Sequence, residues 1–230
     1  MSGKDRTNRR LLAKYKKLIG ELRYLYTNLD YHKEEHGYRK EDFNDTFRDW
    51  CEEFGYDCSS LKTRETFEEK QVDPYKQKVT KKELEEIQEK VYNDPEELSE
   101  DSEDAEKDLK ALYKKIATKT HPDKLTFEEE ESIKEKKRQL FMEAKQAFDE
   151  QNFFRLSQIA EQLGVELPPP SKQQLVWMSE EKKRIEKIIS NIEQTYEWVC
   201  GEPENPNMTL EMLYRQYAET IGCVKLEKEG

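Results

Sequence analysis

The chain has 230 residues, of which 40% are charged and only 34% hydrophobic, and its 51 acidic against 40 basic residues give a formal net charge of −11. This composition excludes one large apolar core and favours long amphipathic helices, so we predict an all-α protein. No run approaches the roughly 18 apolar residues of a membrane span, and no apolar signal core follows the basic N-terminus, which predicts a cytoplasmic protein.

A basic helix is predicted at the N-terminus. Residues 1–33 carry nine Lys and Arg against three acidic residues, a net charge of +6. Apolar residues recur there at alternating spacings of four and three, at Leu11, Tyr15, Leu18, Leu22, Leu25 and Leu29. Such a heptad seam is typical of a coiled coil and leaves open packing within the chain or in an oligomer. The basic charge also leaves nucleic-acid binding open, although such patches in acidic proteins commonly face an acidic neighbour.

A second, acidic helix is predicted to carry an aromatic stripe at Phe43, Phe47, Trp50 and Phe54 and to end at Gly55 in a left-handed cap. Opposite charge and aromatic burial predict that it packs on the basic helix as a hairpin. The pattern weakens over residues 59–74. We therefore expect residues 1–79 to form an N-terminal helical region, with limited proteolysis cutting within 59–74.

Histidines and cysteines do not predict a metal site. His32 and His36 lie four apart, but six residues separate Cys51 from Cys58, whereas structural zinc ligands are typically separated by about two to four. Core or surface roles are expected for them, with no metal and no cofactor. Four cysteines (Cys51, Cys58, Cys200 and Cys223) are also few for a disulfide scaffold, which predicts reduced thiols.

The next helix is predicted over residues 80–91, with Leu84, Ile87 and Val91 on one face and a capping box of Thr80 and Glu83 at its start. Residues 94–108 are dense in acidic side chains and poor in apolar ones. We expect the first part of this segment to be a solvated loop.

An amphipathic helix then leads to His121-Pro122-Asp123-Lys124. Its apolar face consists of Leu109, Leu112, Tyr113, Ile116 and Ala117, and its opposite face carries Lys107, Lys110, Lys114, Lys115 and Lys119. Because Pro122 disfavours helical geometry in the residue before it, this helix should end near Lys119 or Thr120. The following tripeptide is therefore predicted to be a loop.

A long charged helix leaves that loop, with a capping box of Thr126 and Glu129 predicted at its start. Its apolar stripe consists of Phe127, Ile133, Leu140, Phe141, Ala144, Ala147 and Phe148. Two apolar stripes joined by a short loop pack as an antiparallel hairpin. The sequence therefore predicts His121, Pro122 and Asp123 exposed at its tip.

Three more helices are predicted towards the C-terminus. Asn152 caps a short apolar helix that Gly164 stops, and Pro168, Pro169 and Pro170 form a stiff linker. A capping box of Ser171 and Gln174 opens a helix with apolar residues up to Val199, which ends at Gly201 and Pro203. A last helix over residues 209–221 is expected to complete a C-terminal hairpin within residues 168–230.

The central hairpin resembles the J-domain of DnaJ (Hsp40) co-chaperones, whose His-Pro-Asp loop stimulates ATP hydrolysis by Hsp70. The matching positions are Leu109, Tyr113, Lys114, Lys115, Ile116, Ala117 and Lys119 before the loop, and Phe141, Ala147 and Phe148 after it. The span from His121 to Phe141 is longer than in common J-domains, and Ala144 replaces a family isoleucine. The family's first and fourth helices are not evident, although residues 80–91 are a candidate for the first.

The resemblance implies a J-domain-like region over residues 80–167 and a co-chaperone that is not itself an enzyme. The lysine-bearing face of the helix would dock on an acidic Hsp70 surface, His121 and Asp123 would reach a polar network of the partner, and Pro122 would fix the loop. The alternative is a helical adaptor whose degenerate J-domain does not activate Hsp70. The sequence contains no phosphate-binding glycine loop and no nucleophile motif, and therefore does not indicate an enzyme.

Overall fold

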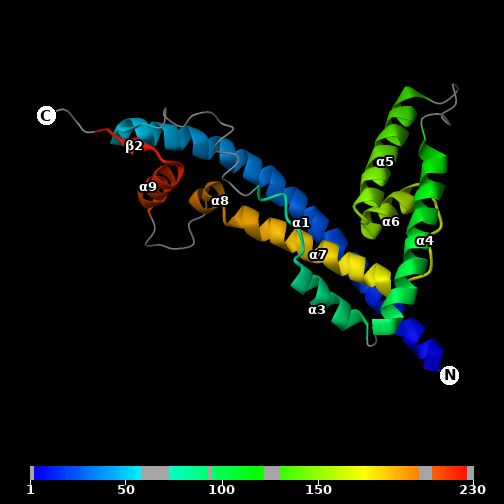
Figure 1. Cartoon of the computed structure of the whole chain (residues 1–230). Helices are drawn as coiled ribbons and strands as arrows, with labels where there is room; N and C mark the ends of the chain where they lie inside the picture. The colour runs from blue at the N-terminus through cyan, green and yellow to red at the C-terminus, as the bar shows by residue number, and fades with distance from the viewer. Residues whose placement is uncertain (1–2, 58–72, 93–94, 122–129, 202–208, 227–230) are drawn as a thin grey trace. The chain divides into compact units, whose positions relative to one another are not determined.

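The computed structural model describes residues 3–57, 73–92, 95–121, 130–201 and 209–226, which form eight helices and two strands of two residues (Figure 1). The expected all-α character is confirmed for this part of the chain. Contacts group the residues into a first unit, residues 1–24 with 79–183, and a second unit, residues 25–78 with 184–230. The predicted division into residues 1–79, 80–167 and 168–230 concerns which regions fold separately, and it remains a prediction. Within the described ranges, no helix is long and apolar enough to cross a membrane.

The N-terminal segment is one continuous helix, α1 (Gly3–Phe54), so the predicted hairpin within residues 1–79 is wrong. The change from basic to acidic surface near residue 40 alters the solvent-facing side chains and not the backbone. No proline interrupts the segment, and the interior Gly20 and Gly37 each cost a helix only about 1 kcal/mol. The predicted end is confirmed, because Gly55 has a φ of 69°. The segment 59–72, where a cleavable boundary was expected, lies outside the described residues.

The heptad seam of α1 is covered within the chain. Tyr15, Leu22 and Leu29 are buried, and the Tyr15 ring meets the edge of Phe153 at 6.3 Å between centroids. The seam left open packing within the chain or in an oligomer, and packing within the chain accounts for these three buried positions.

The start of α3 (Lys81–Val91) is confirmed. Thr80 and Glu83 form the predicted capping box, with the Thr80 amide donating to the Glu83 carboxylate at 2.8 Å. However, α3 buries none of its residues. Leu84, Ile87 and Val91 on its predicted apolar face are half-buried, and the match of α3 to the first helix of a J-domain stays a prediction.

The acidic segment after α3 is helical, so the loop expected at the start of residues 94–108 is wrong. Helix α4 (Pro95–Thr120) begins at Pro95, a residue that suits the first helical position. Its first turns are also anchored. The Asp101 carboxylate accepts hydrogen bonds from the Tyr92 hydroxyl at 2.7 Å and from the Gln173 amide at 2.6 Å. The high charge of this segment therefore does not prevent it from packing, because Asp101 accepts a hydrogen bond from the Gln173 amide in the first turn of another helix.

Helices α5 (Glu131–Asp149) and α6 (Phe153–Gln162) follow. The predicted cap of α6 is confirmed, because Asn152 accepts from the Arg155 amide at 2.9 Å. Gly164 has a φ of 60° and ends the helix as expected. Helix α6 is the most apolar element of the first unit, burying Phe153, Phe154, Leu156, Ile159 and Ala160.

Helix α7 (Lys172–Glu193) begins with the predicted Ser171 and Gln174 capping box, in which the Gln174 amide donates to the Ser171 hydroxyl at 3.2 Å. It stops before the predicted end at Gly201, and a separate helix, α8 (Tyr196–Gly201), follows. Thr195 accounts for the break. Its hydroxyl donates to the Ile192 carbonyl at 2.8 Å and accepts from the Trp198 amide at 3.3 Å, which offers the backbone an alternative to helix continuation.

The core of the second unit joins the aromatic stripe of α1 to α9 (Leu210–Ile221). The rings of Phe43 and Phe47 each lie 4.9 Å from the Tyr217 ring, in edge-on geometry. The partner of the stripe is therefore α9, and not the basic N-terminal segment. Helix α9 begins after Thr209 as predicted, but it packs on α1 and α8 rather than forming a simple hairpin with α7.

A short antiparallel pairing closes this unit, between β1 (Tyr56–Asp57) and β2 (Val224–Lys225), with Tyr56 opposite Lys225. Cys51 and Cys200 carry reduced thiols, whereas Cys223 is disulfide-bonded, so the expectation of reduced cysteines is wrong for Cys223. The cysteine content of a chain indicates how many disulfides its fold needs. It does not show whether two particular cysteines lie close enough to form one. Burial raises the pKa of the Cys200 thiol to about 11, with Glu197 adding to the shift, which keeps this thiol protonated at neutral pH.

Candidate functional site

Helices α4 and α5 form the predicted antiparallel pair (Figure 1). The Tyr113 and Phe148 rings stack with centroids 4.6 Å apart, and the rings of His121 and Phe141 meet edge to face at 5.1 Å. The later of these positions on the α4 side therefore meets the earlier position of α5, which defines opposite directions. The end of α4 lies beside Phe141, in the middle of α5, and the first turns of α5 extend beyond it.

The facing sides of this hairpin are buried as the apolar spacing predicted. Leu109, Leu112 and Ile116 of α4 are at most 3% exposed, and Leu140, Ala144 and Ala147 of α5 are buried as well. The first part of the predicted α5 stripe is wrong, since Ile133 is 45% exposed and the helix begins only at Glu131. The proposed Thr126 and Glu129 cap and Phe127 lie outside the described residues.

Helix α4 ends at Thr120, as the position of Pro122 predicted. Thr120 is fully buried, and its hydroxyl donates to the Ile116 carbonyl at 3.0 Å. His121 still donates its amide to the Ala117 carbonyl at 2.8 Å, and it is half-buried against Phe141, rather than standing free at the tip. Pro122, Asp123 and Lys124 lie outside the described residues.

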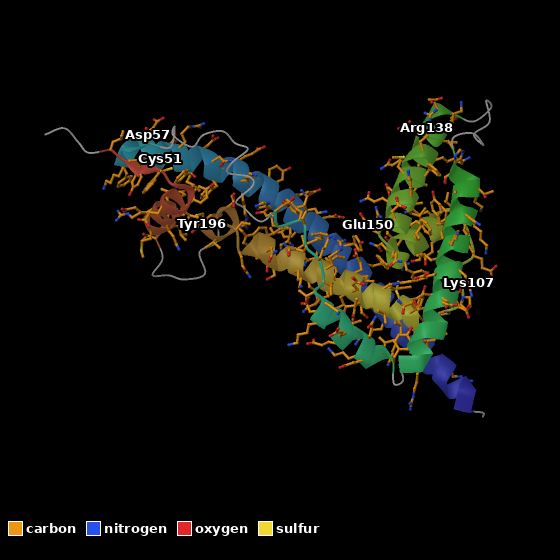
Figure 2. The ribbon with its side chains drawn as sticks, in the orientation of Figure 1. Cys51, Asp57, Lys107, Arg138, Glu150 and Tyr196 are labelled. Atoms are coloured by element: carbon orange, nitrogen blue, oxygen red, sulfur yellow. The ribbon has the colours of Figure 1, made fainter. Side chains whose placement is uncertain are left out.

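The five lysines assigned to the basic face of α4 are all exposed, and Figure 2 labels Lys107 among them. Two of them are engaged within the chain. Lys107 pairs with Asp104 at 2.9 Å, which raises the pKa of Lys107. Lys119 donates to the Leu163 carbonyl at 2.7 Å, at the C-terminal end of α6, where a cation is favourable.

The remaining three lysines form what we call the lysine face: Lys110, Lys114 and Lys115. Within the described ranges they make no hydrogen bond or ion pair through their side chains. Three ammonium groups on one exposed helix surface attract an acidic partner through water. The arrangement suits binding rather than bond-making chemistry.

Helix α6 packs against both helices of the hairpin. The Arg155 guanidinium on α6 donates to the Glu143 carboxylate on α5 at 3.1 Å, and Phe153 and Phe154 are each 1% exposed. The links from Lys119 and Arg155 have no signal in the sequence, because the charge of a side chain does not identify a partner on another helix. The apolar spacing identifies the buried face of each helix, whereas these two links depend on how the helices pack together.

His32 and His36 have separate structural surroundings in the second unit. His32 lies parallel to the Trp198 ring at 4.9 Å, and its Nε2 lies 3.1 Å from the Glu193 carboxylate. The Nδ1 of His36 lies 2.6 Å from the Tyr75 hydroxyl oxygen. Among the described residues, no group of three or more potential metal-binding side chains is present.

Acid should destabilise the protein through His36. Burial lowers the pKa of its imidazole below the ordinary 6.5, against the attraction of Glu197 and with the repulsion of Lys40. The unfolded chain then binds the proton more readily, so this contribution to stability is complete above pH 6.5 and is lost as the pH falls towards the lowered value. We expect the free energy of unfolding to fall more steeply below neutral pH in the parent than in His36→Gln. Parallel pH profiles from denaturant titrations would contradict this.

Neither family models nor comparisons with curated proteins and with solved structures give a match to this chain.

Proposed function

We propose that this protein is a cytoplasmic J-domain co-chaperone that binds an Hsp70 through the His121-Pro122-Asp123-Lys124 loop and the lysine face, and stimulates its ATP hydrolysis. The observation that carries the proposal is the hairpin of α4 and α5. Helix α4 ends at Thr120, directly before the tripeptide, and Tyr113 and Phe148 hold the two helices antiparallel. A J-domain presents its loop in the same sequence and helical setting.

The lysine face supplies the first step of the proposed mechanism. Lys110, Lys114 and Lys115 are exposed on α4, whose other side is occupied by Leu112 and Ile116. Their charge would steer the hairpin onto an acidic Hsp70 surface without disturbing the hairpin core. His121 and Asp123 would then make the specific polar contacts, while Pro122 restricts the loop backbone. Hsp70 itself would carry out the ATP chemistry.

The second candidate is a helical adaptor that keeps the hairpin without activating Hsp70. Two observations favour it: α3 buries no residue, and Lys119 is held by the Leu163 carbonyl instead of projecting towards a partner. An adaptor of this kind would bind its partners with no effect on the rate of ATP hydrolysis. The measurement that separates the two candidates is therefore a rate and not an affinity.

Charge reversal on the lysine face tests the docking step. We expect Lys110→Glu with Lys114→Glu to lower Hsp70 stimulation by on the order of tenfold or more at low salt, because the lysines would then meet the acidic partner with like charge. The loss should shrink as salt increases, since exposed charges are screened within about 10 Å at 0.1 M. Single-turnover hydrolysis across a salt series measures both effects.

The matched control is Lys136→Glu with Lys145→Glu. These lysines are exposed on α5, so the control makes the same change in net charge on the other helix of the hairpin. It should leave stimulation close to the parent value. Equal loss in both double variants, or no loss at low salt in the α4 variant, would contradict docking through the lysine face.

A further inference from the structure

The second unit contains a cavity of about 780 Å3 that the proposed function does not use. This volume falls within the range of roughly 300 to 1,000 Å3 that is typical of ligand sites. Its lining includes the polar and charged residues His36, Lys40, Asp73, Tyr75, Asn191 and Glu197. All of its lining residues belong to the second unit, so the cavity is complete within it.

Glu197 is the central group of this cavity. It stands in the first turn of α8 and is only 7% exposed, yet its carboxylate makes no hydrogen bond or ion pair with any described residue. Glu197 nevertheless affects the pKa values of neighbouring groups electrostatically. Burial raises the pKa of Tyr75, and Asp73 and then Glu197 raise it further. The residue is largely buried while its carboxylate is unpaired, so this arrangement favours a cation from outside the chain.

His36 is the second polar group with unused bonding capacity. It is 6% exposed, and its Nδ1 is engaged with the Tyr75 hydroxyl at 2.6 Å, but its Nε2 is buried without a hydrogen-bond partner. Glu197 is close enough to influence the His36 imidazole electrostatically, although the two are not hydrogen-bonded to each other. A buried nitrogen without a hydrogen-bond partner therefore belongs to the same cavity lining as the unpaired Glu197 carboxylate. Buried polar groups in native proteins are generally hydrogen-bonded.

The lysines that line the cavity do not neutralise Glu197. Lys76 already pairs with Asp73 at 3.3 Å, and Lys40 is exposed on α1, where water screens its charge. The Glu197 carboxylate therefore has no ion-pair partner among the described lysines that line the cavity. Two aromatic side chains, Tyr75 and Tyr196, also contribute to the lining, and aromatic rings can attract a cation.

We infer that this cavity binds an arginine side chain of a partner polypeptide, with Glu197 as the counter-ion of its guanidinium group. Arginine suits the site because its planar guanidinium binds a carboxylate through two parallel hydrogen bonds and stacks on aromatic rings. Its N–H groups can also satisfy acceptors beyond the carboxylate. This inference does not rest on Hsp70 activation, because no residue of the α4 and α5 hairpin lines the cavity.

Binding of a minimal probe to the full chain tests the inference. Nα-acetyl-arginine amide should bind saturably when followed by NMR of the His36 and tyrosine ring signals, and Nα-acetyl-citrulline amide, its uncharged analogue, should bind at least about tenfold more weakly. Glu197→Gln should weaken the arginine probe by a similar factor. Glu41→Gln, an exposed carboxylate on α1 that does not line the cavity, is the matched control and should bind as the parent does.

Equal binding of the arginine and citrulline probes, equal binding by Glu197→Gln and the parent, or no saturable binding of the arginine probe would each overturn the inference. If Glu197→Gln fails to fold, the comparison of the two probes on the parent chain decides the question. Binding of spermidine without binding of the arginine probe would overturn the assignment to a polypeptide and indicate a free polyamine instead.

Discussion

Replacing Asp123 by asparagine should abolish stimulation of Hsp70 while leaving the melting temperature of the protein nearly unchanged. Aspartate and asparagine have almost the same size, so the substitution removes a charge and little else. Losing one group of a specific polar contact typically costs about 2 to 5 kcal/mol of binding when the partner group is left buried. The sequence predicts Asp123 in an exposed loop, and surface substitutions usually change stability by only about 0.5 kcal/mol. Function and stability should therefore separate in this variant.

His121→Gln should also abolish stimulation, but at a measurable cost in stability. The His121 ring meets Phe141 edge to face at 5.1 Å, and such aromatic pairs contribute roughly 0.5 to 1.5 kcal/mol. Comparing the two variants by single-turnover hydrolysis and thermal melting distinguishes the roles of the two residues. A folded Asp123→Asn protein that stimulates Hsp70 as the parent does would contradict the proposed mechanism.

The second large effect is expected from Ile116→Ala in the hairpin core. Ile116 is fully buried on α4, and replacing a buried isoleucine by alanine costs about 2 to 5 kcal/mol through lost burial and the cavity left behind. The free energy of unfolding from denaturant titration should fall by that amount. Stimulation should then be lost in proportion to the unfolded fraction as the temperature rises.

Lys115→Ala is the neighbouring control for stability, because Lys115 is exposed on the same helix. Its free energy of unfolding should stay within about 0.5 kcal/mol of the parent value. If Ile116→Ala unfolds at the same denaturant concentration as Lys115→Ala, the packing described for α4 is wrong.

Local sequence signals located the hairpin well. The spacing of Leu109, Leu112 and Ile116 identified the buried face of α4, and Pro122 placed its end at Thr120. Both signals act over a few residues, through helix periodicity and backbone sterics. Capping residues such as Asn152 were equally informative, because a cap needs only a side chain and the amides of the next turn.

The errors arose where distant segments decide the structure. Opposite charge predicts a neighbouring basic helix as the partner of the aromatic stripe of α1, whereas Tyr214 and Tyr217, far along the chain, cover it. Charge was also a poor guide to element boundaries, since α1 continues through its change of charge and α4 begins inside an acidic run. A sequence pattern shows that a face needs a partner, but it does not identify which segment supplies that partner.

The same limit applies to the cavity of the second unit. His36, Tyr75 and Glu197 come from three well-separated parts of the sequence, and none carries a local motif. The spacing of His32 and His36 drew attention to a possible metal site, but their neighbours are aromatic rings, a hydroxyl group and single carboxylates. Recognising this site required the arrangement of α1, α8 and residues 73–76 in space.

Single-turnover ATP hydrolysis by a purified Hsp70, measured with and without the full chain, tests the central proposal most directly. We predict that the parent protein accelerates hydrolysis in a concentration-dependent manner and that Asp123→Asn, at the same concentration and equally folded, does not. An unchanged hydrolysis rate at every concentration of the parent protein would contradict the co-chaperone proposal and favour the adaptor.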